Sequence, residues 1–472
     1  MLKRPNKQDS SDDSPLQFPK ALMPYVRKAP LPVLVRSTLE WLLEQATLEQ
    51  LFEDTAQDQY TRELTLTFLV DLMLDVASGI QPSALKAFKA RSDDLAISRQ
   101  AFYAKLRRME PAVSAAVVEQ FATLAGQAIE SLGPCHAEPI QGYLACVLDG
   151  MVMGGRCEHR IKPLHSLQAA GLTSHALAVY RPAQHMVSQV VLDEDAYSGE
   201  RTLVDQLLIR AGQLWIADRN FCMRAFLFRL HRAQAAFLMR WHGTSCPYEA
   251  IEPLHAAAST TQGALEQKVW LHDHQSDEWL EVRRIVLPLA ESTRNGDTEL
   301  ILMTNLPETV QADQIGQAYR GRWKIETHFQ RLTQQLHCEP PALNYPRAAL
   351  FAFAMAVCAG NALAVVQQAL QQVHGEEAVA ELSYYALVLE ISQIWLGMAI
   401  VMPTEKWKFI RHCRPDQLVA WLRYVAQHVR MDRFRRIRRG PKKPPTQKRP
   451  INKDNLQFHV SVKRLLDEQK TT

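Results

Sequence analysis

The stretch Ala318-Tyr-Arg-Gly-Arg-Trp-Lys-Ile-Glu-Thr-His-Phe-Gln-Arg-Leu-Thr-Gln-Gln-Leu336 predicts one amphipathic helix. At about 100° per residue, four polar side chains fall within roughly 60° of one another: Tyr319, Arg322, Glu326 and Thr333. The neighbouring apolar stripe consists of Ile325, Phe329, Leu332 and Leu336. A carboxylate beside a phenol and a guanidinium suits both a metal ion and a phosphate. An Arg–Glu pair on an ordinary surface helix explains the same spacing.

Two aspartates farther upstream follow short apolar runs. Asp149 follows 143–148, and Asp218 follows 214–217. Side chains at the carboxyl ends of neighbouring strands can converge at one sheet edge, and a helix packed across that edge can bring Glu326 as a third acid. Three crowded carboxylates repel one another unless a divalent cation lies among them, and oxygen ligands suit Mg²⁺ or Mn²⁺. Each acid also has a structural interpretation, as a turn residue, a helix cap or an ion-pair partner.

Taken together, these blocks resemble the DDE transposases of the insertion-sequence-four group. The helix matches the family signature Y-x2-R-x3-E at Tyr319, Arg322 and Glu326. The stretches 147–150 and 214–221 look like the blocks that hold the first and second aspartates of that family. The resemblance covers roughly residues 140 to 445 and includes a strand-rich insertion before the glutamate and a basic tail at Arg439–Lys443.

The resemblance implies a ribonuclease-H-like core in which Asp149, Asp218 and Glu326 are the catalytic and metal-binding residues, with Mg²⁺ or Mn²⁺ as cofactor. It implies cleavage of phosphodiesters at the ends of a mobile element and transfer of the 3′ end into target DNA. The partners would be double-stranded DNA (terminal inverted repeats and target) and a second copy of the chain in a synaptic homodimer. Tyr319 and Arg322 would grip the DNA backbone.

One position departs from the family pattern. The family motif has a lysine seven residues after the glutamate, where this chain has Thr333. Two alternatives therefore remain open: a catalytically decayed DNA-binding protein, and a metal-dependent nuclease of the same fold that cleaves without strand transfer.

The charge of the chain is distributed unevenly. The formal net charge is +4, but residues 430–449 hold ten Lys and Arg residues against the single acid Asp432. This segment carries +9 and leaves the remainder near −5. Such an arm is typical of polyanion binding, although a solubilising tail has the same composition. We expect DNA contacts from four of its residues: Arg436, Arg439, Lys442 and Lys443.

The N-terminal region predicts helices, among them a pair at Ser83–Ala90 and Ser98–Met109. Ser98 is a good N-cap, and Arg99 is the first of several basic or amide side chains on the second helix. A helix-turn-helix with Arg99 at DNA is compatible with this pattern, and so is a plain helical bundle.

Length and composition predict a folded protein of two or three domains, since its 472 residues are 47% apolar and 22% charged. We expect an α/β (α+β) fold: a ribonuclease-H-like mixed sheet flanked by helices, with a strand-rich insertion, an N-terminal helical domain and a C-terminal helical region. The expected boundaries are a polar, disordered leader at 1–34, a helical DNA-binding region at 35–138, a catalytic core at 139–345 with its insertion at about 234–305, a C-terminal helical region at 346–429 and a basic tail at 430–472.

The expected location is the bacterial cytoplasm, at the nucleoid and without membrane association. The eight cysteines are scattered without CxxC pairs, which is typical of reduced, packed residues in a cytosolic protein, and the polar N-terminus shows no signal peptide. The run Ala348–Val366 is long enough to cross a bilayer, with Asn361 its only strongly polar residue. Its Ala and Gly content favours a buried helix instead.

Overall fold

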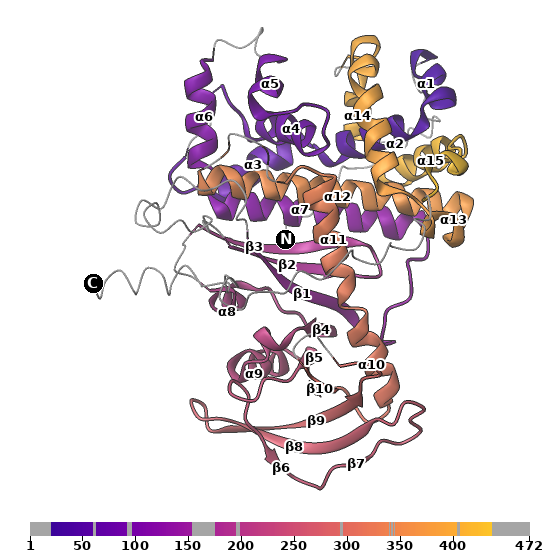
Figure 1. Ribbon diagram of the computed structural model, residues 1–472. Coiled ribbons are helices and arrows are strands. Elements are labelled where there is room, and N and C mark those ends of the chain that lie inside the picture. The colour runs from indigo at the N-terminus through magenta and orange to yellow at the C-terminus, as the bar shows by residue number, and fades with distance from the viewer. Residues whose placement is uncertain are drawn as a thin grey trace, which may run out of the picture.

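The computed structural model describes residues 20–436 apart from 60–62, 92–96, 153–174, 195–198, 293–295, 339, 341, 342, 344, 404 and 405. Figure 1 shows a layer of helices packed on one end of a long twisted sheet. The fold is mixed α/β, with a ten-stranded mixed sheet flanked by helices, as the sequence predicted.

The sheet has the strand order β3-β2-β1-β4-β5-β10-β9-β8-β6, with β7 paired to β8. The strands are β1 (Leu144–Val152), β2 (His175–Arg181), β3 (Met186–Asp193), β4 (Gln213–Ala217), β5 (Ala236–Arg240), β6 (Glu249–Ala250), β7 (His255–Ala256), β8 (Leu265–Asp273), β9 (Glu278–Pro288) and β10 (Glu299–Thr304). β4 runs parallel to both β1 and β5, and the other pairs are antiparallel. The five strands β3-β2-β1-β4-β5 form the part of the sheet where the sequence predicted a ribonuclease-H-like core.

The strand-rich insertion continues this sheet. β10 pairs with β5, β9 with β10, and β8 with β9, so the core and the insertion share one hydrogen-bonded ladder. The four strands expected between 234 and 305 are present, but β5 belongs to the core because it runs parallel to β4. The two-residue strands β6 and β7 were not expected, since so short a pairing leaves no alternation to detect.

The sheet separates two apolar cores. Ala145 and Val147 of β1 face the larger core, which the helical layer shares, whereas Cys146 and Leu148 face a smaller one. This alternation follows from the two-residue period of a strand. The smaller core lies under α8 (Glu200–Leu203), η3 (Val204–Gln206) and α9 (Arg224–Arg232).

Both ends of the described chain build the helical layer. Its N-terminal members are η1 (Lys20–Leu22), α1 (Met23–Lys28), α2 (Pro30–Leu42), α3 (Gln45–Thr55), α4 (Leu66–Ala77), α5 (Ala84–Lys89), α6 (Arg99–Arg108) and α7 (Pro111–Leu132). Its C-terminal members are α12 (Pro346–His374), α13 (Glu376–Ala380), α14 (Tyr384–Val401), η6 (Lys408–His412), α15 (Pro415–Ala426) and η7 (Met431–Phe434). Trp41 Nε1 donates to the Cys413 carbonyl (3.1 Å), and Trp421 Nε1 donates to Ser37 Oγ (2.8 Å), so the two sets pack as one body.

The helical layer begins earlier than expected. The predicted disordered leader extended to residue 34, but the chain is helical from Lys20, and Leu22 and Val26 are fully buried. These two side chains are four residues apart, on one face of the helical segment. Because that face packs into the large core, the segment is ordered despite the polar residues before it.

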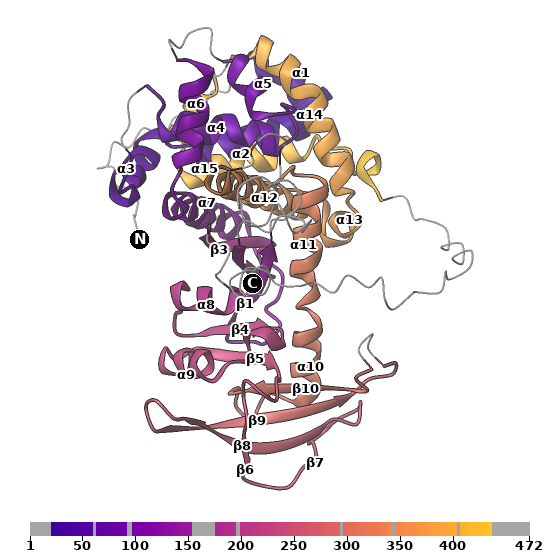
Figure 2. The same ribbon diagram turned by 60° about the vertical axis from the view of Figure 1, so that its left-hand side comes forward.

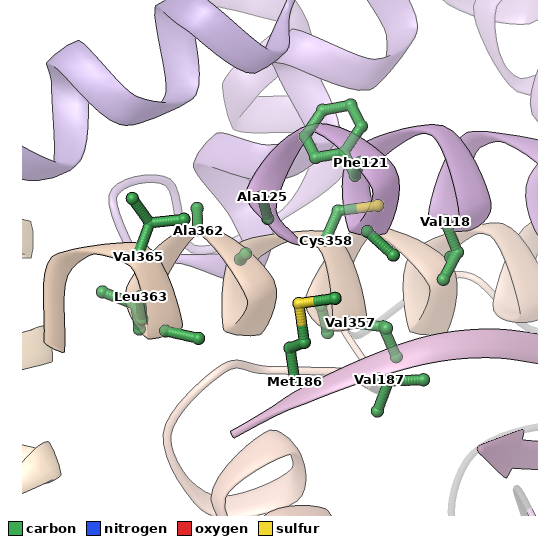
Figure 3. Packing of buried hydrophobic residues seen from close by; sticks show 14 of the residues in the cluster. Val118, Phe121, Ala125, Met186, Val187, Val357, Cys358, Ala362, Leu363 and Val365 are labelled. Atoms are coloured by element: carbon green, nitrogen blue, oxygen red, sulfur yellow. The ribbon is translucent and has the colours of Figure 1, made fainter. Parts of the chain in front are cut away.

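α12 is the central helix of the layer and lies beside α7 (Figure 1). Figure 3 shows Val357 and Cys358 of α12 beside Met186 and Val187 of β3. Asn361, the strongly polar residue of the run Ala348–Val366, joins α12 to β3 by two hydrogen bonds. Its Oδ1 accepts from Val187 N (2.9 Å), and its Nδ2 donates to Val187 O (2.8 Å).

Three described helices are long and apolar enough to cross a membrane, namely α7, α12 and α14. The structure buries 94% of the apolar window of α12 but only 33% of that of α14. The run Ala348–Val366 is thus a buried helix, as expected. None of the seven described cysteines forms a disulfide, and six of them are buried, while Cys157 lies outside the described residues.

Candidate active site

The register of β1 and β4 places the two candidate aspartates side by side. The strands pair in parallel up to Leu148 opposite Ala217, and Asp149 and Asp218 are the next residues of each. Neighbouring strands lie about 4.8 Å apart. Asp149 is not the end of its strand, as the sequence suggested, because β1 continues to Val152 along β2. It lies instead where the pairing with β4 ends, which opens the edge beside it.

The predicted single helix is two helices in the structure, α10 (Ala312–Arg320) and α11 (Trp323–Gln334), which run almost continuously along one side of the sheet (Figure 2). At the junction the hydrogen bonding tightens, since Arg322 N donates to Tyr319 O (2.9 Å) and Ile325 N to Arg322 O (3.1 Å). Gly321 lies in this turn. The predicted apolar stripe is confirmed, with all four members buried: Ile325, Phe329, Leu332 and Leu336.

Arg322 joins two of the three acids. Its Nη1 lies 3.4 Å from Asp149 Oδ2, and its Nη2 lies 2.8 Å from Glu326 Oε1. The exposed fraction rises from 10% for the Arg322 side chain to 19% for Asp149 and 38% for Glu326. One guanidinium therefore connects β1 to α11 at the open edge of the sheet, over 173 residues of sequence.

The local electrostatics show that carboxylates crowd this edge. Burial raises the pKa of Asp149 to about 7; Arg322 opposes the shift, whereas Asp218 and Glu326 add to it. Burial acts against the charge of Arg322, but Tyr319, Asp149 and Glu326 outweigh it and raise its pKa. Burial also raises the pKa of Tyr319 to about 12, so that this phenol is neutral. The edge holds more negative charge than Arg322 alone balances.

A divalent cation suits the donor chemistry of this edge. Carboxylate oxygens are the ligands that Mg²⁺ and Mn²⁺ prefer, and Arg322 already places positive charge between Asp149 and Glu326. Among the described residues, however, no three His, Cys, Asp or Glu side chains are gathered closely enough to hold a metal. The three acids would have to draw together, and Arg322 to turn aside, for all three to bind one ion.

Asp218 also has the capping role considered from the sequence. It is the N-cap of η4 (Arg219–Phe221), and its Oδ1 accepts from Asn220 N (2.8 Å). The Asn220 side chain in turn donates from Nδ2 to Glu200 Oε2 (2.9 Å). Glu200 was missed by the sequence reasoning. Its only signal is an acid at the start of the helix that follows the third strand.

The predicted DNA-binding residues have different surroundings. Tyr319 and Arg322 are buried, so neither presents an open phosphate site. Arg99 is exposed at the start of α6, after Ser98, whose Oγ accepts from Ala101 N (3.1 Å) as the N-cap prediction required. Arg436 Nε donates to the Leu382 carbonyl (2.8 Å). The other three lie outside the described residues: Arg439, Lys442 and Lys443.

Two further residues of α11 differ in their surroundings. Thr333 is exposed, but its hydroxyl donates into its own helix, to Phe329 O and Gln330 O (3.1 Å each). Trp323 is 62% exposed. Its ring lies 5.3 Å from the Arg322 guanidinium.

Part of the chain, including part of this edge, is similar to a known family. Residues 165–361 match the family model of the transposase DDE domain. This segment includes Asp218, Arg322 and Glu326, whereas Asp149 precedes it. No curated protein matches the chain.

Among solved structures, the chain is similar to the piggyBac transposase in a synaptic complex with hairpin DNA. The sequences are 11% identical, and the match covers 82% of this chain and 85% of that one. The TM-score of 0.40 is too low to support an argument about function.

Proposed function

We propose that this chain is a DDE-type DNA transposase that cleaves phosphodiesters at the ends of a mobile element and joins the 3′ end to target DNA. The supporting observation is that strand register places Asp149 beside Asp218 at one sheet edge, where Arg322 links Asp149 to Glu326. The transposase DDE domain match over residues 165–361 supports the same conclusion.

Asp149, Asp218 and Glu326 would hold a divalent cation, which when bound supplies Lewis-acid activation of the attacking hydroxyl and neutralises the leaving oxygen. Before DNA binds, Arg322 would keep the carboxylates of Asp149 and Glu326 together. Its guanidinium would then turn to a phosphate of the DNA. Tyr319, which is buried in the structure, would donate a hydrogen bond to the DNA backbone beside the reacting bond once Arg322 has turned to the phosphate. The same set of residues serves both cleavage and joining, since each is an in-line displacement at phosphorus.

The remaining parts of the proposal concern partners and location. The basic segment with Arg436, Arg439, Lys442 and Lys443, and Arg99 on α6, would bind DNA phosphates in a salt-dependent manner. Two copies of the chain would bring the two ends of the element together. The protein would act in the bacterial cytoplasm, at the nucleoid.

The test is a strand-transfer assay with Mg²⁺. Its substrate is a duplex carrying the inverted repeat that flanks the coding region, supplied with a supercoiled target plasmid. We expect nicked or broken ends first and joined products later. Cleavage without joining would replace the proposal by a nuclease of the same fold. Absence of cleavage together with sequence-specific binding would replace it by a decayed DNA-binding protein.

The decayed protein is the second candidate because of Thr333. Where related enzymes have a lysine, this side chain directs its hydroxyl to its own backbone and offers no charge to a phosphate. The two candidates differ in one result, since only the transposase cleaves in Mg²⁺ and loses cleavage on Glu326→Gln. A matched control is Glu278→Gln, a half-exposed carboxylate paired to Arg232 at a distant part of the sheet.

A further inference from the structure

Asn220 lies at the centre of a hydrogen-bonded network behind the candidate site. Its main-chain N donates to Asp218 Oδ1 (2.8 Å). In its side chain, Nδ2 donates to Glu200 Oε2 (2.9 Å), and Oδ1 accepts from Arg201 Nε (3.0 Å). Arg201 Nη1 also donates to Ser245 Oγ (3.2 Å). The amide is thus fixed at both ends, so the turn that orients Asp218 cannot rotate without breaking bonds to α8.

Glu200 also lies against the residue that follows Asp149. A Cβ on Gly150 would overlap the Glu200 carboxylate, although Gly150 has no left-handed backbone conformation that would itself require glycine. A side chain at this position would therefore have to displace the flexible end of Glu200. Glu200 contacts both strands of the site, β1 at Gly150 and, through Asn220, the turn after β4.

α8 is well anchored for such a role. Arg229 of α9 donates to two carbonyls just after α8, Val204 O and Leu207 O (2.5 Å each). Leu203 is buried in the smaller core. α8, which includes Glu200, lies on the same side of the sheet as α9, whereas α11, which includes Glu326, lies on the other side (Figure 2). Arg322 therefore bonds Asp149 from one side, whereas Glu200 supports the turn of Asp218 through Asn220 from the other.

We propose that Glu200 and Asn220 are positioning residues, which fix Asp218 and the Asp149–Gly150 backbone in the orientation that the reaction needs. This inference rests on the proposed function. What Glu200 supplies is a hydrogen-bond acceptor for Asn220 Nδ2, and a neutral amide at the same place supplies one too. The charge of Glu200 is then dispensable, whereas its length and acceptor are not.

The test compares three variants and one control. Glu200→Ala removes the acceptor, Glu200→Gln keeps it, and Gly150→Ala pushes the flexible end of Glu200 away from β1. The control Gly199→Ala adds the same methyl group one residue before Glu200, where nothing lies within 4 Å. The two readouts are single-turnover cleavage as a function of Mg²⁺ concentration, and binding of Mn²⁺ to the DNA-free protein by electron paramagnetic resonance.

We expect Glu200→Ala and Gly150→Ala to weaken Mn²⁺ binding and slow cleavage by about 10- to 100-fold, the usual effect of losing an outer-shell partner. Glu200→Gln should stay within about threefold of the parent protein, because the amide keeps the acceptor for Asn220 Nδ2. Gly199→Ala should match the parent.

An equally impaired Glu200→Gln would overturn the proposal in favour of a direct cation ligand, and an unimpaired Glu200→Ala would overturn it altogether. The Mn²⁺ measurement separates this inference from the proposed function. If the parent protein binds Mn²⁺ through Asp218 but does not cleave DNA, the function fails while the positioning role is still decided by Glu200→Ala against Glu200→Gln.

Discussion

Two charged clusters of this molecule are mirror images in composition. At the sheet edge, one arginine, Arg322, lies between two carboxylates, Asp149 and Glu326. In the helical layer, one carboxylate, Glu40, lies between two arginines, since it pairs with Arg36 and accepts from Arg411 Nε (2.7 Å). Glu40 is 0% exposed, whereas Glu326 is 38% exposed.

The difference in exposure shows that the Glu40 cluster, the closed cluster, stabilises the fold, whereas the Arg322 cluster, the open cluster, is accessible to a ligand. Glu40 is compensated and closed off from solvent, and it connects α2 to η6. The sheet edge has an excess of acid, because Asp218 and Glu200 lie beside the Arg322 cluster, and it opens to solvent at Glu326. Uncompensated charge at an accessible edge is unfavourable for folding alone and favourable for binding a cation or a phosphate.

The largest expected effect is on catalysis at the open cluster. Asp149→Asn should reduce single-turnover cleavage by on the order of 10³-fold, about 4 kcal/mol of barrier, because it removes a carboxylate that acts with the others as a unit. The unfolding midpoint in urea should not fall, because the neutral amide avoids the cost of burying a charge and the repulsion from Asp218 and Glu326, which together outweigh the lost attraction of Arg322. A variant that cleaves like the parent would remove Asp149 from the site.

The closed cluster should respond in the opposite way. Glu40→Gln removes the carboxylate that bonds both buried arginines and leaves them the longer-range attraction of Asp71, so the free energy of unfolding should fall by up to about 3–5 kcal/mol. Urea denaturation measures the loss. The folded fraction that remains should cleave DNA at the parent rate. A variant of normal stability but low activity would contradict the structural role of this cluster.

Replacing the arginine distinguishes the clusters with a milder change. A lysine can bond one carboxylate but cannot form the fork that spans two. Arg322→Lys should slow cleavage by about 10- to 100-fold, or about 1.4–2.7 kcal/mol of barrier, with little change in stability. Arg411→Lys should reduce stability by about 1 kcal/mol and leave cleavage unchanged. Cleavage kinetics and urea denaturation of both variants measure the two effects. Equal loss of activity in both would contradict the assignment of a catalytic role to Arg322 and a structural role to Arg411.

Acid should destabilise the fold by protonating one histidine, His185. His185 lies in the β2–β3 turn next to Tyr180 and His136, and burial lowers its pKa to about 4. The neutral ring is favoured in the fold, so its stabilisation is complete above the unfolded pKa of about 6.5 and is lost as the pH falls toward 4. At pH 5 the loss is up to about 2 kcal/mol.

His185→Asn is the matching variant, because asparagine tolerates the φ of 55° at this position. The difference in unfolding free energy between pH 7 and pH 5 should be smaller by up to about 2 kcal/mol in the variant than in the parent protein. An unchanged pH dependence would show that His185 titrates as it does in the unfolded chain.

The smallest effect concerns Thr333. Thr333→Lys adds one exposed charge near the open cluster, so DNA affinity should rise several-fold and the log–log salt slope should steepen by about 0.9. Fluorescence anisotropy at several salt concentrations measures both. If neither affinity nor slope changes, this face of α11 does not contact DNA.

The sequence predicted the parts of the fold that depend on the spacing of apolar residues or on a capping residue. The apolar stripe that begins at Ile325, the Ser98 cap and the buried run around Asn361 were all foreseen, since each rests on local spacing. The break at Gly321 was not, because a tightened turn keeps nearly helical dihedrals and preserves the pattern. Strand register brings Asp149 beside Asp218, and no local pattern encodes that register.

The parts of the site that were missed depend on tertiary contacts. Glu200 has an ordinary helix-start context in the sequence, and only folding places it against Gly150 and Asn220. The burial of Tyr319 and Arg322 was likewise invisible, because spacing places them on a polar face without showing that Asp149 would meet that face.

The central claim is that Asp149, Asp218 and Glu326 act as one catalytic unit. Its most direct test is single-turnover cleavage of the inverted-repeat duplex by Asp149→Asn, Asp218→Asn, Glu326→Gln and the triple variant. We predict that each single change costs on the order of 10³-fold and that the triple variant is scarcely slower than any one, while all four still bind the duplex. A single variant that retains parent-level cleavage, or losses that multiply through to the triple variant, would contradict the claim.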